Sequence, residues 1–179
     1  SKGEKIDIVV MIQGDEPMVV PQMIELAVNP LINDQSVKVS NLMKKVKSNK
    51  EWIDPNEVKV VVDNNDNALY FSREPIPNLI KKNTSSFLGY KQVCIISFAK
   101  EYLFLFNKMK QTPLEISESI DMLRCLENNH KIKVVETEYS NWSVDTSDDL
   151  KIVEKMILDD VKTYIDTYAE KQDSVEDLK

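Results

Sequence analysis

Two adjacent carboxylates follow an apolar, β-branched run near the start of the chain. Residues 6–12 are apolar except for one aspartate, and the run ends in Gln13-Gly14-Asp15-Glu16-Pro17. Such a run is typical of a central strand buried on both faces in a parallel α/β sheet. The glycine permits a close turn and the proline cannot rejoin the ladder, so Asp15 and Glu16 are expected at the strand's carboxyl end, where open α/β sheets bind ligands. A carboxylate fixed there suits Mg²⁺, although the pentapeptide could also be an ordinary polar turn.

A second candidate ligand, Asp145, stands directly before a helix-start signal. The residues that follow, Thr146-Ser147-Asp148-Asp149, have the capping-box pattern. A carboxylate before a helix N-terminus is oriented by nearby amides and stays ionised, which suits a metal ligand. The same acid could instead cap the helix or lie solvated in a loop. About 130 positions separate Asp145 from Asp15, and nothing in the spacing shows that the two acids meet.

The pattern of apolar residues predicts alternating strands and helices that would carry these acids. Strands are expected over residues 6–12, 37–42, 58–62, 68–71, 92–98 and 132–135, with 58–62 and 68–71 forming a hairpin. Helices are expected over residues 21–28, 100–109, 112–127 and from 146 to about 172. The other capping-box signal lies earlier in the chain, at Thr112. Glu115 is expected to act there as a cap and not as a ligand. The basic cluster at Lys44 is expected to be a solvated face.

Composition narrows the class of protein. The chain has 179 residues, about one domain, and a net charge of −7, which argues against a nucleic-acid partner. Its two cysteines, Cys94 and Cys125, form no Cys-x-x-Cys pair and no disulfide framework, so a cytoplasmic location is expected. No apolar run approaches the roughly 20 residues needed to span a bilayer, and none of the three glycines lies in a Gly-rich phosphate loop.

Six short motifs occur in order between about residues 6 and 156. They are Val10-Met11-Ile12-Gln13-Gly14-Asp15-Glu16-Pro17, Asn56-Glu57-Val58-Lys59-Val60-Val61, Ala68-Leu69-Tyr70-Phe71-Ser72-Arg73-Glu74-Pro75-Ile76-Pro77, Thr112-Pro113-Leu114-Glu115, Leu123-Arg124-Cys125-Leu126-Glu127 and Val144-Asp145-Thr146-Ser147-Asp148-Asp149-Leu150. In this combination and order they resemble the 3-deoxy-manno-octulosonate cytidylyltransferases, the CMP-Kdo synthetases.

The resemblance implies a fold and a reaction. The fold would be the α/β, three-layer, mixed-sheet nucleotide-diphospho-sugar transferase (Rossmann-like) fold, or part of it. The reaction would join CTP to an acidic 2-keto sugar, giving the CMP-sugar and pyrophosphate, with the anomeric hydroxyl oxygen attacking the α-phosphorus. Asp15 and Asp145 would hold Mg²⁺, and the ion with cationic side chains would offset the repulsion between two anionic reactants. Residues 1–158 would form the C-terminal part of the cytidylyltransferase domain, and 159–179 a helical extension and tail.

Four further residues are candidates for the substrate. Arg73 could grip a carboxylate or phosphate as a rigid bidentate donor and so be catalytic with Asp15, or it could form a surface ion pair with Glu74. Gln13 and Glu118 are candidates for sugar hydroxyls, and Glu118 could equally be a solvated helix residue. Gln92 stands where many members of the family carry histidine. It could donate to the sugar carboxylate but cannot carry charge, so another ulosonic acid is a candidate substrate.

The family's N-terminal strand and its Arg- and Lys-containing loop, which grip the triphosphate, have no counterpart in this sequence. We therefore expect this polypeptide alone not to turn over CTP, and a longer form to do so. The alternative is a non-catalytic α/β module that docks a partner through the C-terminal helix. The apolar stripe of that helix over residues 150–168 would serve either a partner or the homodimer that we expect.

Overall fold

The computed structural model describes residues 5–78, 89–139, 142–144 and 146–176, with side chains described as far as residue 161. The chain separates into two compact units, each of which is described by itself. One unit comprises Ser1–Gln13 and Val19–Tyr139, and the other comprises Gly14–Met18 and Ser140–Lys179.

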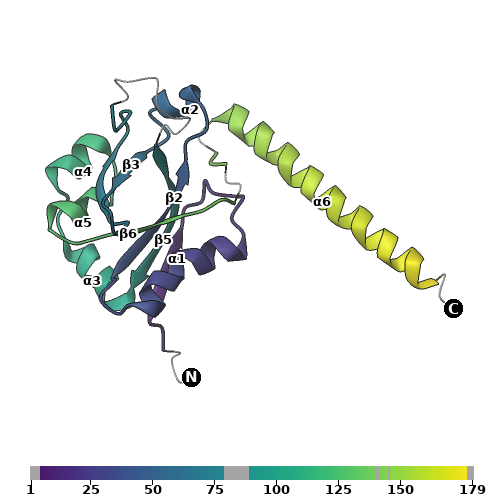
Figure 1. Cartoon of the computed structure of the whole chain (residues 1–179), viewed down its shortest axis with the longest axis horizontal. Helices are drawn as coiled ribbons and strands as arrows, with labels where there is room; N and C mark the ends of the chain where they lie inside the picture. Colours follow the sequence, from purple (N-terminus) through teal and green to yellow (C-terminus); the bar gives the residue numbers. More distant parts are fainter. Residues whose placement is uncertain (1–4, 79–88, 140–141, 145, 177–179) are drawn as a thin grey trace. The chain divides into compact units, whose positions relative to one another are not determined.

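The first unit is built on a six-stranded mixed sheet (Figure 1). Its strands are β1 (Ile8–Ile12), β2 (Val39–Lys45), β3 (Lys59–Val62), β4 (Ala68–Ser72), β5 (Tyr90–Ala99) and β6 (Lys133–Glu136). The order is β4-β3-β5-β2-β6, and β1 also pairs with β5. The expected strands are therefore confirmed, including the β3–β4 hairpin.

β5 is the centre of this sheet. It pairs antiparallel with β2 along one edge over most of its length. Along its other edge it pairs with β3 at Tyr90 and Lys91, and then with β1 from Ile95 to Ala99. The strand changes partner between these two stretches, where Gln92 donates its backbone N–H to Val58 and Cys94 accepts one from Gln13.

The expectation that the first strand is central and buried on both faces is wrong for the described part of the chain. There β1 pairs only with β5, in antiparallel orientation, and Ile8 to Met11 are half-buried. An apolar run indicates that its side chains suit a β-sheet. It does not indicate how many neighbouring strands will pair with it.

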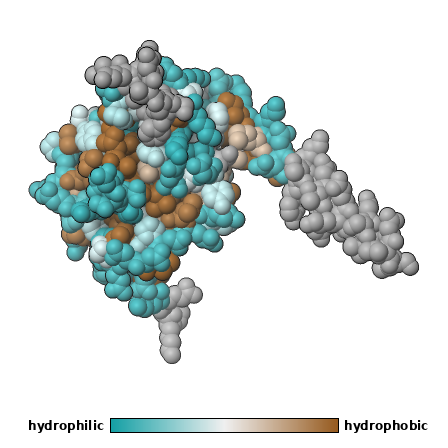
Figure 2. Space-filling view, viewed as in Figure 1, coloured by the Kyte–Doolittle hydropathy of each residue, from teal (hydrophilic) through white to brown (hydrophobic). Residues whose placement is uncertain are grey.

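Helices cover both faces of the sheet and make three layers (Figure 1). On one face α1 (Pro21–Asn33) buries Met23 and Ala27 against Leu42, Val93 and Ile95. On the other face lie α3 (Lys100–Lys108), α4 (Pro113–Glu118) and α5 (Leu123–Glu127). That face carries the larger core, which includes fully buried Phe71, Phe98, Leu123 and Ile132. On the face seen in Figure 2, exposed apolar residues lie in patches among polar ones.

The single helix expected over residues 112–127 is two helices, α4 and α5. Ser119 ends α4 in the left-handed conformation, with φ of 55°. Ile120 and Met122, in the connecting turn, are buried at 4% and 1% exposure. Apolar spacing continues across this turn, which is why the periodicity suggested one helix. The predicted cap by Glu115 is confirmed, since its carboxylate accepts from the Thr112 backbone N–H at 3.2 Å.

Three lysines lie side by side across β2, β5 and β3. Lys44 pairs in register with Lys91, and Lys91 with Lys59. All three are buried, at 8%, 6% and 0% exposure, so the expected solvated face is wrong for Lys44. The Lys91 ammonium contacts Glu51 (2.6 Å) and Glu57 (2.9 Å), and Lys59 donates to the Asp54 carbonyl (2.7 Å). The carboxylates come from α2 (Asn49–Ile53) and from the loop that follows it, so long-range contacts satisfy this charge.

The second unit consists mainly of α6 (Ser147–Glu176). Thr146 and Asp149 cap it reciprocally: Asp149 donates its backbone N–H to the Thr146 hydroxyl (3.2 Å), and its carboxylate accepts from the Thr146 N–H (2.8 Å). Leu150, Ile157 and Val161 are exposed, while Tyr164 and Tyr168 of the predicted stripe lie outside the described side chains. Among the described residues no helix is long and apolar enough to cross a bilayer.

Candidate active site

The Asp15 turn is held against the segment that leads into α6. The backbone N–H of Val144 donates to the carbonyl oxygen of Asp15, at 2.9 Å. This bond joins positions that the sequence could not connect. Asp145, the predicted second ligand, follows Val144 in the chain and itself lies outside the described residues.

The Asp15 carboxylate has an unpaired oxygen. Its Oδ1 is buried and accepts no hydrogen bond from any residue that the structure describes. A buried carboxylate oxygen without a partner is costly unless a cation or a donor compensates it. The atom therefore fits a metal ligand, and hard oxygen donors suit Mg²⁺. Within the described ranges, no group of three or more His, Cys, Asp or Glu side chains is placed to hold an ion.

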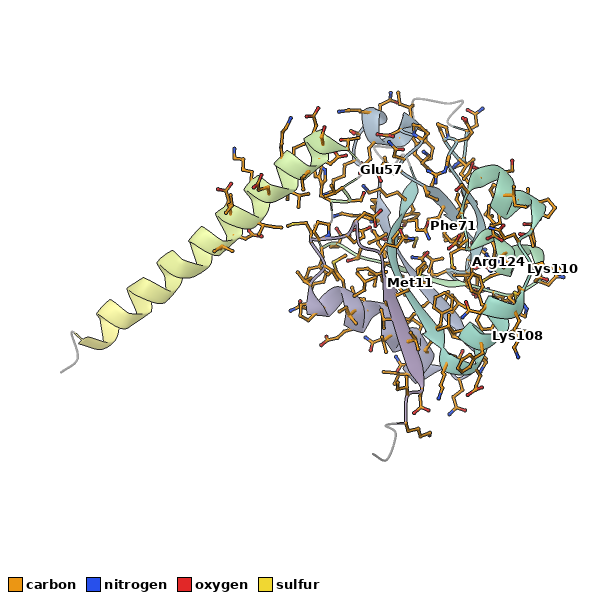
Figure 3. The ribbon with its side chains drawn as sticks, turned by 180° about the vertical axis from the view of Figure 1, so that it is seen from behind. Met11, Glu57, Phe71, Lys108, Lys110 and Arg124 are labelled. Carbon is orange, nitrogen blue, oxygen red and sulfur yellow. The ribbon has the colours of Figure 1, made fainter. Side chains whose placement is uncertain are left out.

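Gln13 directly follows the last residue of β1. Its N–H donates to the carbonyl of Cys94 (3.3 Å), which continues the pairing of Ile12 with Ile95. Residues two positions apart along a strand point to the same face of the sheet, and so do residues opposite each other on paired strands. Gln13 therefore shares its face with Met11, which packs on the larger core and is labelled in Figure 3. The side chain of Gln13 is exposed.

Gln92 lies diagonally from Gln13 on the same face, a separation of about 7–8 Å in an antiparallel pair. Its side-chain amide donates from Nε2 to the Oδ1 of Asn41 on β2, at 2.6 Å. Asn41 is fully buried beside a bulge that interrupts the register of β2 and β5. Asn41 was not predicted as a site residue. The sequence of β2 did not set Asn41 apart, because Ser40 directly before it is polar as well.

Arg73, immediately after β4, is anchored through backbone carbonyls and not through Glu74. Its Nε donates to the carbonyl of Glu118 (2.7 Å), Nη1 to Pro55 (2.9 Å) and Nη2 to Ser119 (3.2 Å). A guanidinium has five N–H donors, so two remain for a ligand. Arg73 directly follows Ser72 of β4. Lys59 of β3 pairs with Ser72 on one side and with Lys91 of β5 on the other. Arg73 and Gln92 thus border one row of the sheet, two strands or about 10 Å apart.

Glu118, at the end of α4, binds β4 through its carboxylate. Oε1 accepts from the Ser72 hydroxyl (2.9 Å) and the Tyr70 hydroxyl (3.3 Å), and Oε2 accepts from the Arg73 backbone N–H (2.9 Å). A carboxylate offers about four acceptor positions, so one remains for a sugar hydroxyl. Glu118 is therefore neither merely solvated nor unoccupied, and it fixes the segment that carries Arg73.

The sheet of the first unit thus gathers Gln13, Gln92, Arg73 and Glu118 from four separate elements. Asp15 belongs to the second unit, where it lies beside Val144. These four residues offer two neutral amides, the Arg73 cation and the Glu118 carboxylate, a set that can bind hydroxyl groups and one anionic group. Asp15 offers an uncompensated anionic oxygen, which suits a cation.

Comparison with known proteins places this arrangement in a family. The model of the cytidylyltransferase family matches residues 1–132. The 3-deoxy-manno-octulosonate cytidylyltransferase of Geobacter metallireducens is 42% identical over 160 residues, covering 84% of this chain and 63% of the relative. That of Pelobacter propionicus is 41% identical over 153 residues, covering 80% and 60%.

A solved structure gives the same result. The chain resembles the CMP:2-keto-3-deoxy-manno-octonic acid synthetase complexed with CTP, with a TM-score of 0.79 and 29% identity over 88% of this chain and 64% of that chain. The predicted mixed-sheet nucleotidyltransferase fold is confirmed by this match. The chain spans about three fifths of the length of the curated relatives. By its sequence and its fold, the chain belongs to the cytidylyltransferase family.

Proposed function

We propose that this chain provides the metal and sugar ligands for transfer of CMP from CTP to an acidic 2-keto sugar, 3-deoxy-manno-octulosonate (Kdo) or a related ulosonic acid. In this reaction the anomeric hydroxyl oxygen forms a bond to the α-phosphorus, the bond to the β-phosphate breaks, and pyrophosphate and a proton leave. The observation that carries the proposal is the unpaired, buried Oδ1 of Asp15, in a chain about 40% identical to relatives named for this activity.

Asp15 and Asp145 are the proposed ligands of Mg²⁺. When bound, the ion would offset phosphate charge and polarise a phosphoryl oxygen. The backbone bond between Val144 and Asp15 supports the pair, because it holds the turn of the first ligand beside the residue that precedes the second.

The sugar is assigned to residues of the first unit. Arg73 would direct its two remaining N–H donors to the sugar carboxylate, and its three carbonyl bonds fix the guanidinium in advance. Gln13, Gln92 and Glu118 would bind hydroxyls. Such anchoring favours binding, because a side chain that is already held in one orientation does not have to be ordered when the ligand binds.

Asp15→Asn and Asp145→Asn test the proposal separately. Activity is measured in the longer form that is expected to turn over CTP. There we expect each substitution to lower Mg²⁺-dependent pyrophosphate release from CTP and Kdo by at least about a hundredfold, because a metal contributes several kcal/mol to the transition state. The matched control is Asp148→Asn, an exposed acid paired only with Lys151 among the described contacts. Full activity in both site variants, or an equal loss in the control, would contradict the metal assignment. A wild-type protein that binds neither CTP nor Kdo would favour the non-catalytic module.

A further inference from the structure

The orientation of the Asn41 amide is fixed by its surroundings. Its Nδ2 lies within hydrogen-bond distance of three carbonyl oxygens, those of Val93 (2.7 Å), Leu42 (3.0 Å) and Ile95 (3.4 Å). These are acceptors only, so the nitrogen of the amide must face them, and Oδ1 must face the other way. The irregular pairing of β2 with β5 creates this environment, because β5 has two extra residues, Cys94 and Ile95, between the pair Asn41–Ile96 and the pair Leu42–Val93. Asn41 has no exposed surface and cannot exchange its partners for water.

The fixed Oδ1 in turn determines how Gln92 is oriented. An acceptor at 2.6 Å requires a donor, so the Nε2 of Gln92 must point toward Asn41. The opposite rotamer would place two carbonyl oxygens against each other at the edge of the core. The Oε1 of Gln92 is consequently directed away from Asn41, and it has no hydrogen-bond partner among the residues that the structure describes.

We propose that Asn41 is a positioning residue, which holds Gln92 so that its carbonyl oxygen accepts a hydrogen bond from a hydroxyl of the sugar substrate. This inference rests on the proposed function and sharpens it. From the sequence alone, Gln92 was expected to donate to the sugar carboxylate. The Asn41 contact occupies one Nε2 hydrogen and presents an acceptor, which a carboxylate oxygen would repel.

The consequence is selection for a hydroxyl. A site built to bond a substrate O–H discriminates strongly against an analogue that lacks it, because the acceptor is then left unpaired. Discrimination requires that the acceptor cannot rotate away, and the buried Asn41 supplies that constraint. Position 92 would therefore distinguish among ulosonic acids by the presence and placement of one hydroxyl.

Asn41→Thr and Asn41→Val form the matched pair for the test. The two side chains have the same shape and both suit a strand, but only threonine can accept from Nε2 of Gln92 and donate to a neighbouring carbonyl. Two readouts are needed: the side-chain amide signals of Gln92 in ¹⁵N NMR spectra, and the dissociation constant for Kdo by calorimetry. Gln92→Leu removes the acceptor itself, and Gln22→Leu, an exposed glutamine of α1, is the control for that substitution.

We expect Asn41→Val to shift the Gln92 amide signals to those of a free glutamine and to weaken Kdo binding about three- to tenfold, as loss of one hydrogen bond does. Asn41→Thr should do both to a smaller extent. Gln92→Leu should weaken Kdo by a similar factor, and one singly deoxygenated Kdo analogue should bind wild type and Gln92→Leu equally.

Three outcomes overturn the inference. Gln92 signals that behave as a free amide in wild type refute the Asn41 contact. Equal Kdo affinity in the threonine and valine variants, with both folded, refutes the positioning role. If wild type binds Kdo but every singly deoxygenated analogue still binds wild type and Gln92→Leu with different affinities, Gln92 is not the acceptor of a sugar hydroxyl. Failure of the proposed function looks different, because wild type itself then binds no Kdo.

Discussion

Replacing Arg124 with methionine should destabilise the first unit by about 3 kcal/mol. Arg124, labelled in Figure 3, donates from Nε to the Glu115 carboxylate at 2.8 Å and from Nη2 to its other oxygen. Its guanidinium lies 4.5 Å from the centre of the Phe106 ring. Glu115 is only 2% exposed, so the variant leaves a buried carboxylate with its Thr112 cap and a weak contact to Gln111. Breaking a buried pair costs about 3–5 kcal/mol. The lower end applies because Arg124 keeps 14% of its side chain exposed.

Urea unfolding and thermal scans measure this loss. For a chain of this length, about 3 kcal/mol corresponds to a fall in Tm of about 6–12 °C. The matched control is Lys151→Met, which breaks an exposed pair with Asp148 and should change stability little, since such pairs contribute little. A double variant, Glu115→Leu with Arg124→Met, should recover much of the loss because no buried charge remains.

The same pair predicts a pH dependence. The Arg124 bond lowers the pKa of Glu115 below its ordinary value of 4.5. A carboxyl group whose pKa is lower in the folded protein than in the unfolded chain stabilises the fold fully at pH values above its unfolded pKa. This stabilisation is lost as the pH falls through its folded pKa. The difference in free energy of unfolding between wild type and Arg124→Met should therefore be constant from pH 6 to 7 and shrink below about pH 4. A difference under about 1 kcal/mol at pH 7, or one that does not shrink in acid, would refute the reasoning.

Two further stability predictions concern single residues of the first unit. Burial lowers the pKa of Lys59 below its ordinary 10.5, so wild-type stability should rise with pH between the folded and unfolded values, where the unfolded chain binds more protons. Lys59→Met should reduce that rise in urea titrations carried out at pH values up to 10.5, and an unchanged slope would count against a buried charge. Ser119→Gly should raise stability by about 0.5–1 kcal/mol, because glycine adopts the left-handed conformation without strain. A lower Tm would mean that the Ser119 side chain contributes more than its backbone costs.

Local pattern was sufficient for most elements. The strands are rich in β-branched residues and bounded by turn residues, and each was found within a few positions of its expected bounds. The helix break at Ser119 was missed because burial of Ile120 and Met122 in the turn keeps the apolar spacing intact. The partners of β1 were missed because a strand's own residues do not say which neighbours it has.

The candidate site shows the same division. Asp15 was identified from the residues around it, since a strand end followed by Gly and Pro fixes a carboxylate locally. Its proximity to Val144 was not, because that hydrogen bond joins residues 129 positions apart in the sequence. Asn41 carried almost no signal, since its role depends on carbonyl groups some 52 and 54 positions away.

By itself the sequence determined where strands, turns and capped helices form and which residue types could bind a cation or a sugar acid. These properties depend on backbone preferences and on neighbours within a few residues. Only the tertiary structure decided that Lys44 is buried, that Arg73 and Glu118 are anchored to each other's segments, and that Gln92 turns its amide nitrogen inward. Hydrogen bonds and burial are set by register and packing between distant segments, and a buried polar group must take whichever partners that packing supplies.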